Sequence, residues 1–449
     1  MYKINVNCKV EDCLHYIRYV LEFFNSHPLL PEGNVFVLNE PQTQVQIDYG
    51  IQESKEFYIP CQGLIFGVTV IDNSDIVCNE YMTDTESLFS IESDKKEASP
   101  FIRNLTFGFD ILETAFFHIS RYEEYHCAPS NKDKWDMMWE EQQILVKNGL
   151  YQFPVVDQLV FALFQNIGLQ PKKRKTSFSL SHDIDVIQKF KTPIRIFRSS
   201  VRALLDHGVT GFLNHLKTVI GVWRNTQKDP YDTFNILLID SSTNYFNNQI
   251  LYLMAGGLTE KDNYYQINDK KITSVIKKAK YLGYEIGLHG SYATHKNGVQ
   301  FKKEIDSLAK ATKQSINRNR QHFLHFDFHM TPKILENSGI EIDSSLGYQR
   351  LIGFRCGTGF SYRLFDFEQK QAYKWKEQPM VIMDGALLSE AANSMQAAHQ
   401  ILDSFIEKNQ YYTHITINVH NSIFDPSKRN IKEMKSLYSK MIFAAKKPD

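Results

Sequence analysis

The feature of the sequence that most constrains the fold is a change of pattern near residue 177. From there on, short apolar segments alternate with segments that have the spacing of amphipathic helices. Such alternation predicts βα units and a parallel sheet, because parallel strands are joined by crossover helices. We therefore expect an α/β fold, and we favour a distorted or closed (β/α) barrel over an open sheet. The expected strands are 177–183, 250–256, 284–290, 322–326, 340–343, 381–384 and 411–420, and the expected helices are 270–282, 299–314, 332–338 and 389–408.

The preceding part of the chain, residues 1–170, has a different character. It mixes apolar runs at 35–38 and 63–70 with a helical stretch at 11–24 and an amphipathic helix at 109–125. This mixture predicts a small α+β N-terminal domain, in which we find no catalytic constellation. The basic run Pro171–Lys175 is typical of a solvated linker, so we place the second domain at 171–449.

Length and composition narrow the class of protein. At 449 residues the chain is longer than one hydrophobic core usually serves, which favours two domains. Its 51 basic and 51 acidic residues balance, so no overall field favours nucleic acid as a partner. The six cysteines include no CxxC pair, and we interpret them as reduced thiols. Because neither a signal peptide nor a long apolar run is visible, we expect a cytoplasmic protein with no transmembrane segment.

One stretch, about 190–225, interrupts the βα alternation with helical, basic and amphipathic sequence. It places Arg195, Arg198, Arg202 and Lys217 among apolar residues. We interpret it as a helical insertion. A lid packed on the barrel is the favoured interpretation, and a peripheral helix at a membrane surface is the alternative.

Ionisable residues follow several of the expected strands, at the end where parallel β/α folds build their active sites. Asp183 and Asp185 close the first strand, and a two-residue offset on extended backbone turns both carboxylates to one side. One carboxylate can then bind a metal ion while the other accepts a proton from water. A turn or helix cap is the structural alternative for this Asp-x-Asp motif.

Three further strands add candidates. His289 ends one strand, and an imidazole there suits zinc or a similar divalent ion. Arg320 can hold a carboxylate in its ionised form, and Asp343 follows the next strand. His420 ends the last strand, where it can protonate a leaving amine if a carboxylate tunes its pKa. The structural alternatives are a surface ion pair for Arg320, a capping turn for Asp343 and a buried histidine for His420.

With these residues in order, the chain from about 177 to 425 resembles the polysaccharide deacetylase, or NodB-homology, family. The resemblance implies a distorted (β/α) barrel with Asp183 as catalytic base, Asp185 as a metal ligand and His420 as general acid. It also matches Arg320 to the family's arginine motif and Asp343 to the acidic residue that orients it. The segments 342–348 and 353–358 are similar to a bacterial subgroup with an extra N-terminal domain.

The chain departs from the family at the second motif, His-(Ser/Thr)-x-x-His. His289 matches its first histidine, but Ala293 stands in the place of the second. His295 or His322 would then have to supply the missing ligand, because the ion needs only suitably placed donors.

The function implied by the resemblance is metal-dependent removal of an N-acyl group, acetyl in the first instance, from an amino sugar of a glycan or its precursor. The cofactor would be a divalent ion such as zinc, cobalt or nickel, and the partner a carbohydrate. Two alternatives remain open: a catalytically silent glycan-binding or assembly protein, and a hydrolase of another C–N bond.

Overall fold

The structure is a computed structural model of the full chain. It describes residues 2–9, 11–40, 43–50, 57–59, 61, 110–262, 265–428 and 430–446. The apolar run expected at 63–70 lies outside the described residues.

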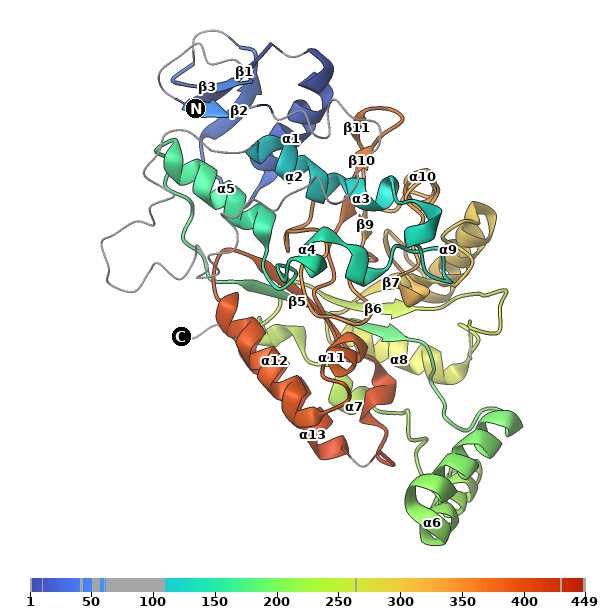
Figure 1. The fold of residues 1–449 in the computed structure, drawn as a ribbon. Coiled ribbons are helices and arrows are strands. Elements are labelled where there is room, and N and C mark those ends of the chain that lie inside the picture. The colour runs from blue at the N-terminus through green and yellow to red at the C-terminus, as the bar shows by residue number, and fades with distance from the viewer. Residues whose placement is uncertain are drawn as a thin grey trace.

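A parallel sheet of eight strands forms the centre of the C-terminal part (Figure 1). Its order is β12-β9-β8-β7-β6-β5-β14-β13, and every pairing is parallel. The sheet curls into a half-barrel whose two edge strands, β12 and β13, do not pair with each other. This architecture agrees with the expected distorted (β/α) barrel. The strands are β5 (Ser177–Ile184), β6 (Gln249–Leu253), β7 (Glu285–Gly290), β8 (Arg318–Gln321), β9 (Ile342–Asp343), β12 (Lys376–Glu377), β13 (Ile382–Met383) and β14 (His414–Asn418).

The helices of this part connect the strands and bury their apolar faces. In α8 (Lys270–Tyr281), for example, Ile272, Val275, Ile276 and Ala279 recur at helical spacing and are all buried. The other crossover helices are α9 (Gly298–Thr312), α10 (Thr331–Asn337), α11 (Asp384–Glu390), α12 (Met395–Lys408) and α13 (Ile431–Ala445). The single helix expected at 389–408 is thus two helices.

One strand lies earlier in the chain than the sequence predicts. The apolar segment 322–326 is not a strand: β8 is the polar segment Arg318–Gln321, and a short 3-10 turn at His322–Leu324 follows it. The hydrophobic pattern misses β8 because its side chains are polar, although Arg320 and Gln321 are both inaccessible to solvent. Buried polar side chains of this kind are stabilised by hydrogen bonds. Arg320 therefore lies in the sheet, and His322 lies just beyond its carboxyl edge.

The N-terminal part contains a second, four-stranded sheet with the order β2-β1-β3-β4. All its pairings are parallel, which the sequence analysis does not anticipate. Its strands are β1 (Tyr2–Cys8), β2 (Asn34–Leu38), β3 (Val45–Tyr49) and β4 (Phe57–Ile59), and its helices are α1 (Leu14–Ser26), α2 (Ile111–Ser120), α3 (Tyr122–Tyr125), α4 (Ile144–Lys147) and α5 (Val155–Asn166).

The two parts share buried polar contacts, most of them made by the segment 353–359. The guanidinium of Arg355 donates two hydrogen bonds to Glu124, of 3.1 and 2.5 Å. Thr358 donates to Asp157 over 2.5 Å, and a Cβ on Gly353 would lie 2.2 Å from the carbonyl oxygen of Tyr151. The segment 353–359 therefore packs closely against the N-terminal part.

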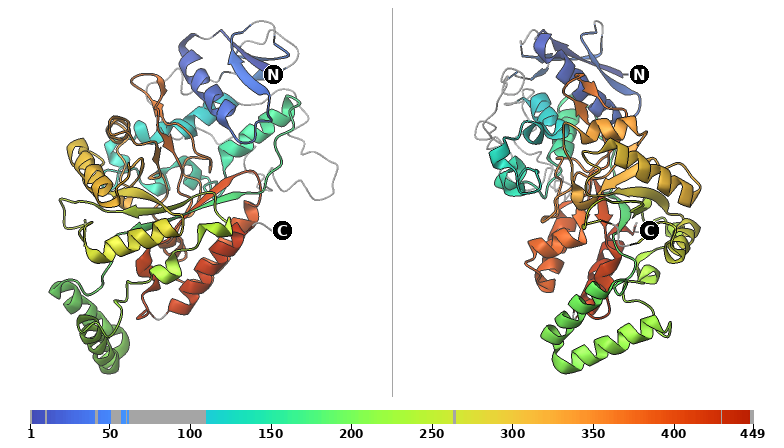
Figure 2. Two further views of the ribbon diagram at one scale, coloured as in Figure 1. Left: turned by 180° about the vertical axis from the view of Figure 1, so that it is seen from behind. Right: turned by 90° about the vertical axis from the view of Figure 1, so that its right-hand side faces the viewer.

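Helix α6 (Pro193–Trp223) occupies the stretch in which an insertion is expected. It is broken at Gly208, whose φ of 66° is unfavourable for other residues, so the two halves run in different directions. Figures 1 and 2 show α6 projecting away from the sheet and not covering it, so the predicted lid is wrong. No helix in the described part of the chain is long and apolar enough to cross a membrane.

Candidate active site

The candidate residues gather at the carboxyl edge of the large sheet because the sheet order brings their strands together. Asp183 lies on β5, His289 on β7 and Arg320 on β8, with β6 between β5 and β7. Asp185 directly follows β5, and His420 follows β14, the other neighbour of β5. These five residues come from four separate stretches of the sequence, which meet only through this order.

Three of the predicted metal ligands form one cluster. Ligand atoms of Asp185, His289 and His322 all lie within 4.8 Å of one another. Oδ1 of Asp185 lies 3.2 Å from Nε2 of His289 and 3.8 Å from Nε2 of His322. Two zinc ligands at bond lengths of about 2.0–2.1 Å and tetrahedral angles are roughly 3.3 Å apart, so this spacing fits a shared ion.

The hydrogen bonds of the two Nδ1 atoms also fit metal binding by His289 and His322. Nδ1 of His289 lies 2.9 Å from the carbonyl oxygen of Arg320, and Nδ1 of His322 lies 3.4 Å from a carboxylate oxygen of Asp262. Carbonyl and carboxylate partners keep the proton on Nδ1, as in most metal-bound histidines, and leave the Nε2 lone pair free to bind. Oδ1 of Asp185 is buried and makes no hydrogen bond to any described residue. The lone pairs of one oxygen and two nitrogens therefore face each other, an arrangement that a cation stabilises.

The imidazoles around Asp185 stabilise its ionised form. Burial raises the pKa of Asp185, but the facing imidazoles outweigh burial and lower it. Burial lowers the pKa of His289, whereas Asp183 and Asp185 raise it, and the net direction is upward.

His295 is not part of this cluster. Its Nδ1 lies 2.8 Å from the carbonyl oxygen of Tyr292, and its ring lies 4.8 Å from that of His325. Of the two replacements considered for the histidine missing at Ala293, the structure brings His322 to Asp185 and leaves His295 elsewhere.

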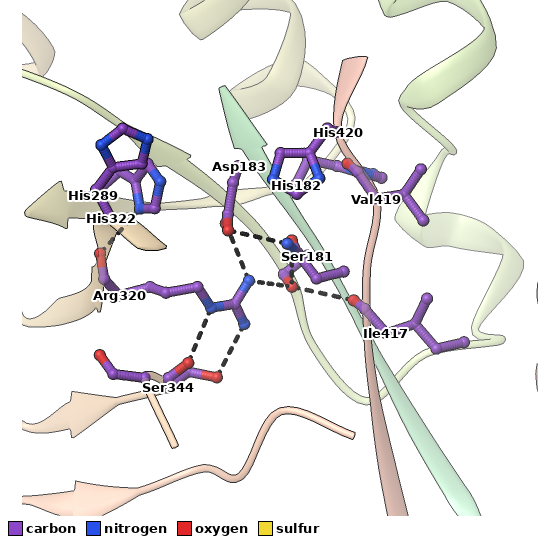
Figure 3. A network of polar contacts seen from close by, with 12 residues as sticks. Ser181, His182, Asp183, His289, Arg320, His322, Ser344, Ile417, Val419 and His420 are labelled. Carbon is purple, nitrogen blue, oxygen red and sulfur yellow. Dashed lines mark hydrogen bonds and ion pairs between the residues drawn. The ribbon is translucent and has the colours of Figure 1, made fainter. Parts of the chain in front are cut away.

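Arg320 on β8 holds the side chain of Asp183 on β5 (Figure 3). Its Nη1 donates to Asp183 Oδ1 over 2.9 Å and to Ser181 Oγ over 2.8 Å. Asn418 donates to the other oxygen of Asp183, also over 2.9 Å. Burial raises the pKa of Asp183, but Arg320 and the nearby imidazoles outweigh it, so the pKa is lowered and the group is ionised. The contact between Arg320 and Asp183 involves a single guanidinium nitrogen.

Asp343 does not hold Arg320 in the way the resemblance implies. Arg320 donates instead to the carbonyl oxygen and to Oγ of Ser344, both over 2.9 Å, and no bond to Asp343 is seen among the described residues. Asp343 accepts from Asn319 over 2.6 Å and lies beside Glu377, where burial raises the pKa of both carboxyl groups. Its geometry is that of a structural residue one strand away from the site.

His420 has a carboxylate partner that the sequence analysis missed. Nδ1 of His420 lies 2.7 Å from Asp384 Oδ1, and its backbone N–H donates to Asp384 Oδ2 over 3.1 Å. Nε2 faces the cluster, 3.8 Å from Asp185 Oδ2. Burial lowers the pKa of His420, but Asp384 outweighs burial and raises it to about 10, so the imidazole is protonated at neutral pH.

The backbone just after His322 is unusual. Phe323 and Leu324 both have left-handed φ values, 58° and 53°, which cost non-glycine residues about 1–2 kcal/mol each. This conformation leaves the Phe323 ring 50% exposed and 4.2 Å from the ring of His322. Strained backbone of this kind is concentrated at functional sites, and here it places an aromatic ring beside the cluster of Asp185, His289 and His322.

Two positioning residues were therefore overlooked, and their signals differ. Asp384 ends an expected strand, so the rule that singled out His420 could have found it. Asp262 lies in a loop with no motif around it, and only the fold brings it to His322.

Comparisons with known proteins give one family model and several distant similarities to solved structures. A family model described as "Family of unknown function (DUF7033)" matches residues 7–170. A search of curated proteins found no match. Among solved structures, a protein assigned as a polysaccharide deacetylase from Mycobacterium smegmatis is similar at 13% identity, over 60% of this chain and 84% of its own, with a TM-score of 0.34.

Two other similar solved structures are also described as polysaccharide deacetylases. One, from Bordetella bronchiseptica, is assigned as a polysaccharide deacetylase of O-antigen biosynthesis, with 11% identity over 60% of this chain and 80% of its own, and a TM-score of 0.28. The other is a polysaccharide deacetylase from Bacillus cereus, with 10% identity over 60% of this chain and 89% of its own, and a TM-score of 0.28. Similarity at this level does not assign an activity, so the case for one depends on the site.

Proposed function

We propose that this chain is a metal-dependent hydrolase that removes an N-acyl group, in the first instance acetyl, from an amino sugar of a glycan or its precursor. The observation that carries the proposal is the placement of Asp185 Oδ1. It is buried without a hydrogen bond and faces two imidazoles whose Nδ1 atoms are already occupied. An ionised Asp183 lies on β5, and a protonated His420 lies just after the adjoining strand β14.

We assign Asp185, His289 and His322 as the ligands of the ion. When bound, a divalent cation would polarise the acyl carbonyl and lower the pKa of a water molecule. Their two nitrogens and one oxygen form a donor set that suits zinc, and also cobalt or nickel.

The remaining residues supply the proton transfers that amide hydrolysis requires. Asp183, kept ionised by Arg320, accepts a proton from the attacking water. Water adds to the acyl carbon, the C–N bond breaks, and the leaving nitrogen takes a proton from His420. Asp384 keeps His420 protonated until that step. The products are a free amine and a carboxylate.

A carbohydrate substrate is supported by the aromatic surface at the cluster. Phe323 presents a half-exposed ring beside His322, and exposed aromatic rings pack well against the apolar faces of sugars. The family resemblance of the 177–425 region supports the same class of substrate.

The test is the metal content of purified protein, measured by elemental mass spectrometry after reconstitution with zinc. We expect about one ion per chain in the wild type, and a loss in His289→Ala and in His322→Ala. His295→Ala is the matched control, because it removes a neighbouring imidazole that lies outside the cluster, and it should keep the ion.

Two results would contradict the proposal. A wild-type chain that binds no zinc, cobalt or nickel would favour the catalytically silent glycan-binding protein. Loss of the ion in His295→Ala, with the ion kept in His322→Ala, would show that the third ligand is assigned wrongly.

A further inference from the structure

Helix α6 exposes an apolar surface that the rest of the fold does not use. Phe197, Leu205 and Trp223 are 65%, 79% and 64% exposed, although such side chains are usually buried in a folded protein. Figures 1 and 2 show from several sides that α6 projects into solvent. The other exposed apolar side chains of α6 are Ile194, Val201, Leu204, Val209, Leu213 and Ile220.

The exposed apolar residues follow the period of a helix. In the first half of α6, Ile194, Phe197, Val201 and Leu204 recur every three or four residues, so they share one face. In α8 the same pattern is turned inward and all four residues of its apolar face are buried. In α6 the pattern is turned outward, and it therefore implies a surface that lies outside this chain.

The charge of the same segment indicates what that surface is. Between Pro193 and Arg224 the sequence contains five basic residues and one acidic residue, whereas the whole chain has 51 of each. Three of the basic residues, Arg195, Arg198 and Arg202, each directly follow a residue of the exposed apolar stripe. Cations therefore flank the apolar face, which is the arrangement of helices that lie in the headgroup region of an anionic membrane.

A second copy of the chain fits this surface less well. Two such segments would bring like charges together, and charged residues are depleted in the centres of protein interfaces. Trp223 and Phe197 suit the boundary between headgroups and acyl chains, where aromatic rings are enriched. No helix in the described residues spans a bilayer, so the contact would be peripheral.

We propose that α6 docks this protein on a membrane surface that contains anionic phospholipids, with its apolar stripe inserted among the headgroups and its arginines on the lipid phosphates. The break at Gly208 lets two short amphipathic segments, and not one long rod, adapt to the plane of the membrane. Because α6 follows Asp185 and β5 closely in the sequence, it leaves the barrel from the same edge as the candidate active site. This proposal does not depend on the hydrolase activity.

The experiment is flotation of the full-length protein with vesicles of phosphatidylcholine alone and of phosphatidylcholine mixed with phosphatidylglycerol. We expect binding to the anionic vesicles, weaker binding to the neutral ones, and release at high salt. The double variant Phe197→Ser, Leu205→Ser should lose roughly a hundredfold in affinity, from about tenfold for each apolar side chain. Arg198→Gln and Arg202→Gln should each reduce binding to anionic vesicles by about fivefold.

The matched control is Tyr281→Ser, Phe443→Ser, which removes two exposed aromatic side chains outside α6 and should leave vesicle binding unchanged. Thermal unfolding of each variant checks that the fold is retained. A blue shift of fluorescence on mixing with anionic vesicles should be present in the wild type and reduced in Trp223→Phe.

The proposal is overturned if the wild type does not float with anionic vesicles, or if the α6 double variant floats as well as the wild type. Sedimentation of the protein without lipid tests the alternative, in which a second copy of the chain covers α6. Self-association that disappears in the Phe197→Ser, Leu205→Ser variant, together with absent vesicle binding, would assign α6 to a contact between copies of this chain.

Discussion

Two clusters of buried charged residues in this molecule look alike in composition and differ in how their atoms are paired. One is the candidate active site at the carboxyl edge of the large sheet. The other, which we name the junction cluster, consists of Arg121, Glu124 and Arg355 between the N-terminal part and the barrel. Solvent is almost excluded from the junction cluster and from Asp183 and Arg320, whereas the side chain of Asp185 is 32% exposed.

In the junction cluster each charged group meets donors or acceptors of the opposite kind. Both oxygens of Glu124 accept from Arg355, and Oε1 also accepts from Arg121. The remaining nitrogens of the two arginines donate to the carbonyl oxygens of Gly347 and Arg355. In the candidate site, by contrast, Asp185 Oδ1 accepts no hydrogen bond from a described residue and faces two nitrogens. Complete pairing indicates a structural role, and the unpaired acceptor indicates a site that binds something.

The largest expected effect tests the active-site half of this comparison. Asp183→Asn preserves shape and removes the base, so it should lower turnover by roughly a hundredfold to ten-thousandfold. The assay is release of acetate from an N-acetylated glycan that the wild type hydrolyses. Metal content should stay at the wild-type level, because Asp183 is not in the ligand cluster.

The outcome also tells whether the two clusters really differ. If Asp183→Asn mainly lowers the free energy of unfolding and leaves turnover per folded molecule unchanged, then the Asp183–Arg320 pair is structural like the junction cluster. The assignment of Asp183 as base would then be wrong.

The second effect concerns stability. Glu124→Gln leaves Arg355 and Arg121 buried without a counter-charge, which should lower the free energy of unfolding by about 3–5 kcal/mol. The measurement is urea unfolding of the zinc-loaded protein, with metal content unchanged. Asp403→Asn is the control, because its ion pair with Lys440 is largely exposed and contributes at most about 1 kcal/mol.

The same group gives this stability a pH dependence. Burial raises the pKa of Glu124, but Arg355 and Arg121 outweigh burial and lower it to about 2. A carboxyl group with a lowered pKa in the folded state contributes stability above its ordinary pKa, and this contribution is lost as the pH falls towards 2. The difference between wild type and Glu124→Gln should therefore shrink in acid. A difference that stays constant between neutral pH and pH of about 2 would contradict the ion-pair explanation.

Much of the site could be predicted from sequence because each residue ends a segment with a clear pattern. Asp183, Asp185, His289 and His420 all follow apolar runs, and in a parallel sheet such ends lie at one edge. What the sequence could not give is the order of strands in the sheet. That order brings Asp384 to His420, and it places Ser344, not Asp343, against Arg320.

Two of the wrong interpretations have a common physical cause. Periodicity reports which residues avoid water or share a face, but not what they meet. The apolar segment at 322–326 predicts a strand, whereas the strand is the polar segment Arg318–Gln321, whose buried side chains are hydrogen-bonded. The amphipathic pattern of α6 predicts packing on the barrel, whereas its apolar side chains are exposed to solvent.

The smallest expected effect is a shift in the pH dependence of activity. Unlike the tests of the junction cluster, it measures catalysis and not stability. His420 acts in its protonated form, so activity should fall as the pH rises through its pKa, which Asp384 raises to about 10. Asp384→Asn keeps a hydrogen-bonding oxygen but removes the charge, so the fall in activity should begin at lower pH. The measurement is the pH profile of kcat/KM for both proteins. Asp425→Asn is the matched control, because Asp425 is a buried carboxylate paired with Lys189, 2.6 Å away, and with no described contact to His420. If Asp384→Asn lowers the rate but leaves the pH profile unchanged, then Asp384 positions the His420 ring without changing its pKa. If Asp425→Asn shifts the profile equally, then the charge of the whole region, and not the Asp384–His420 pair, sets the pKa of His420.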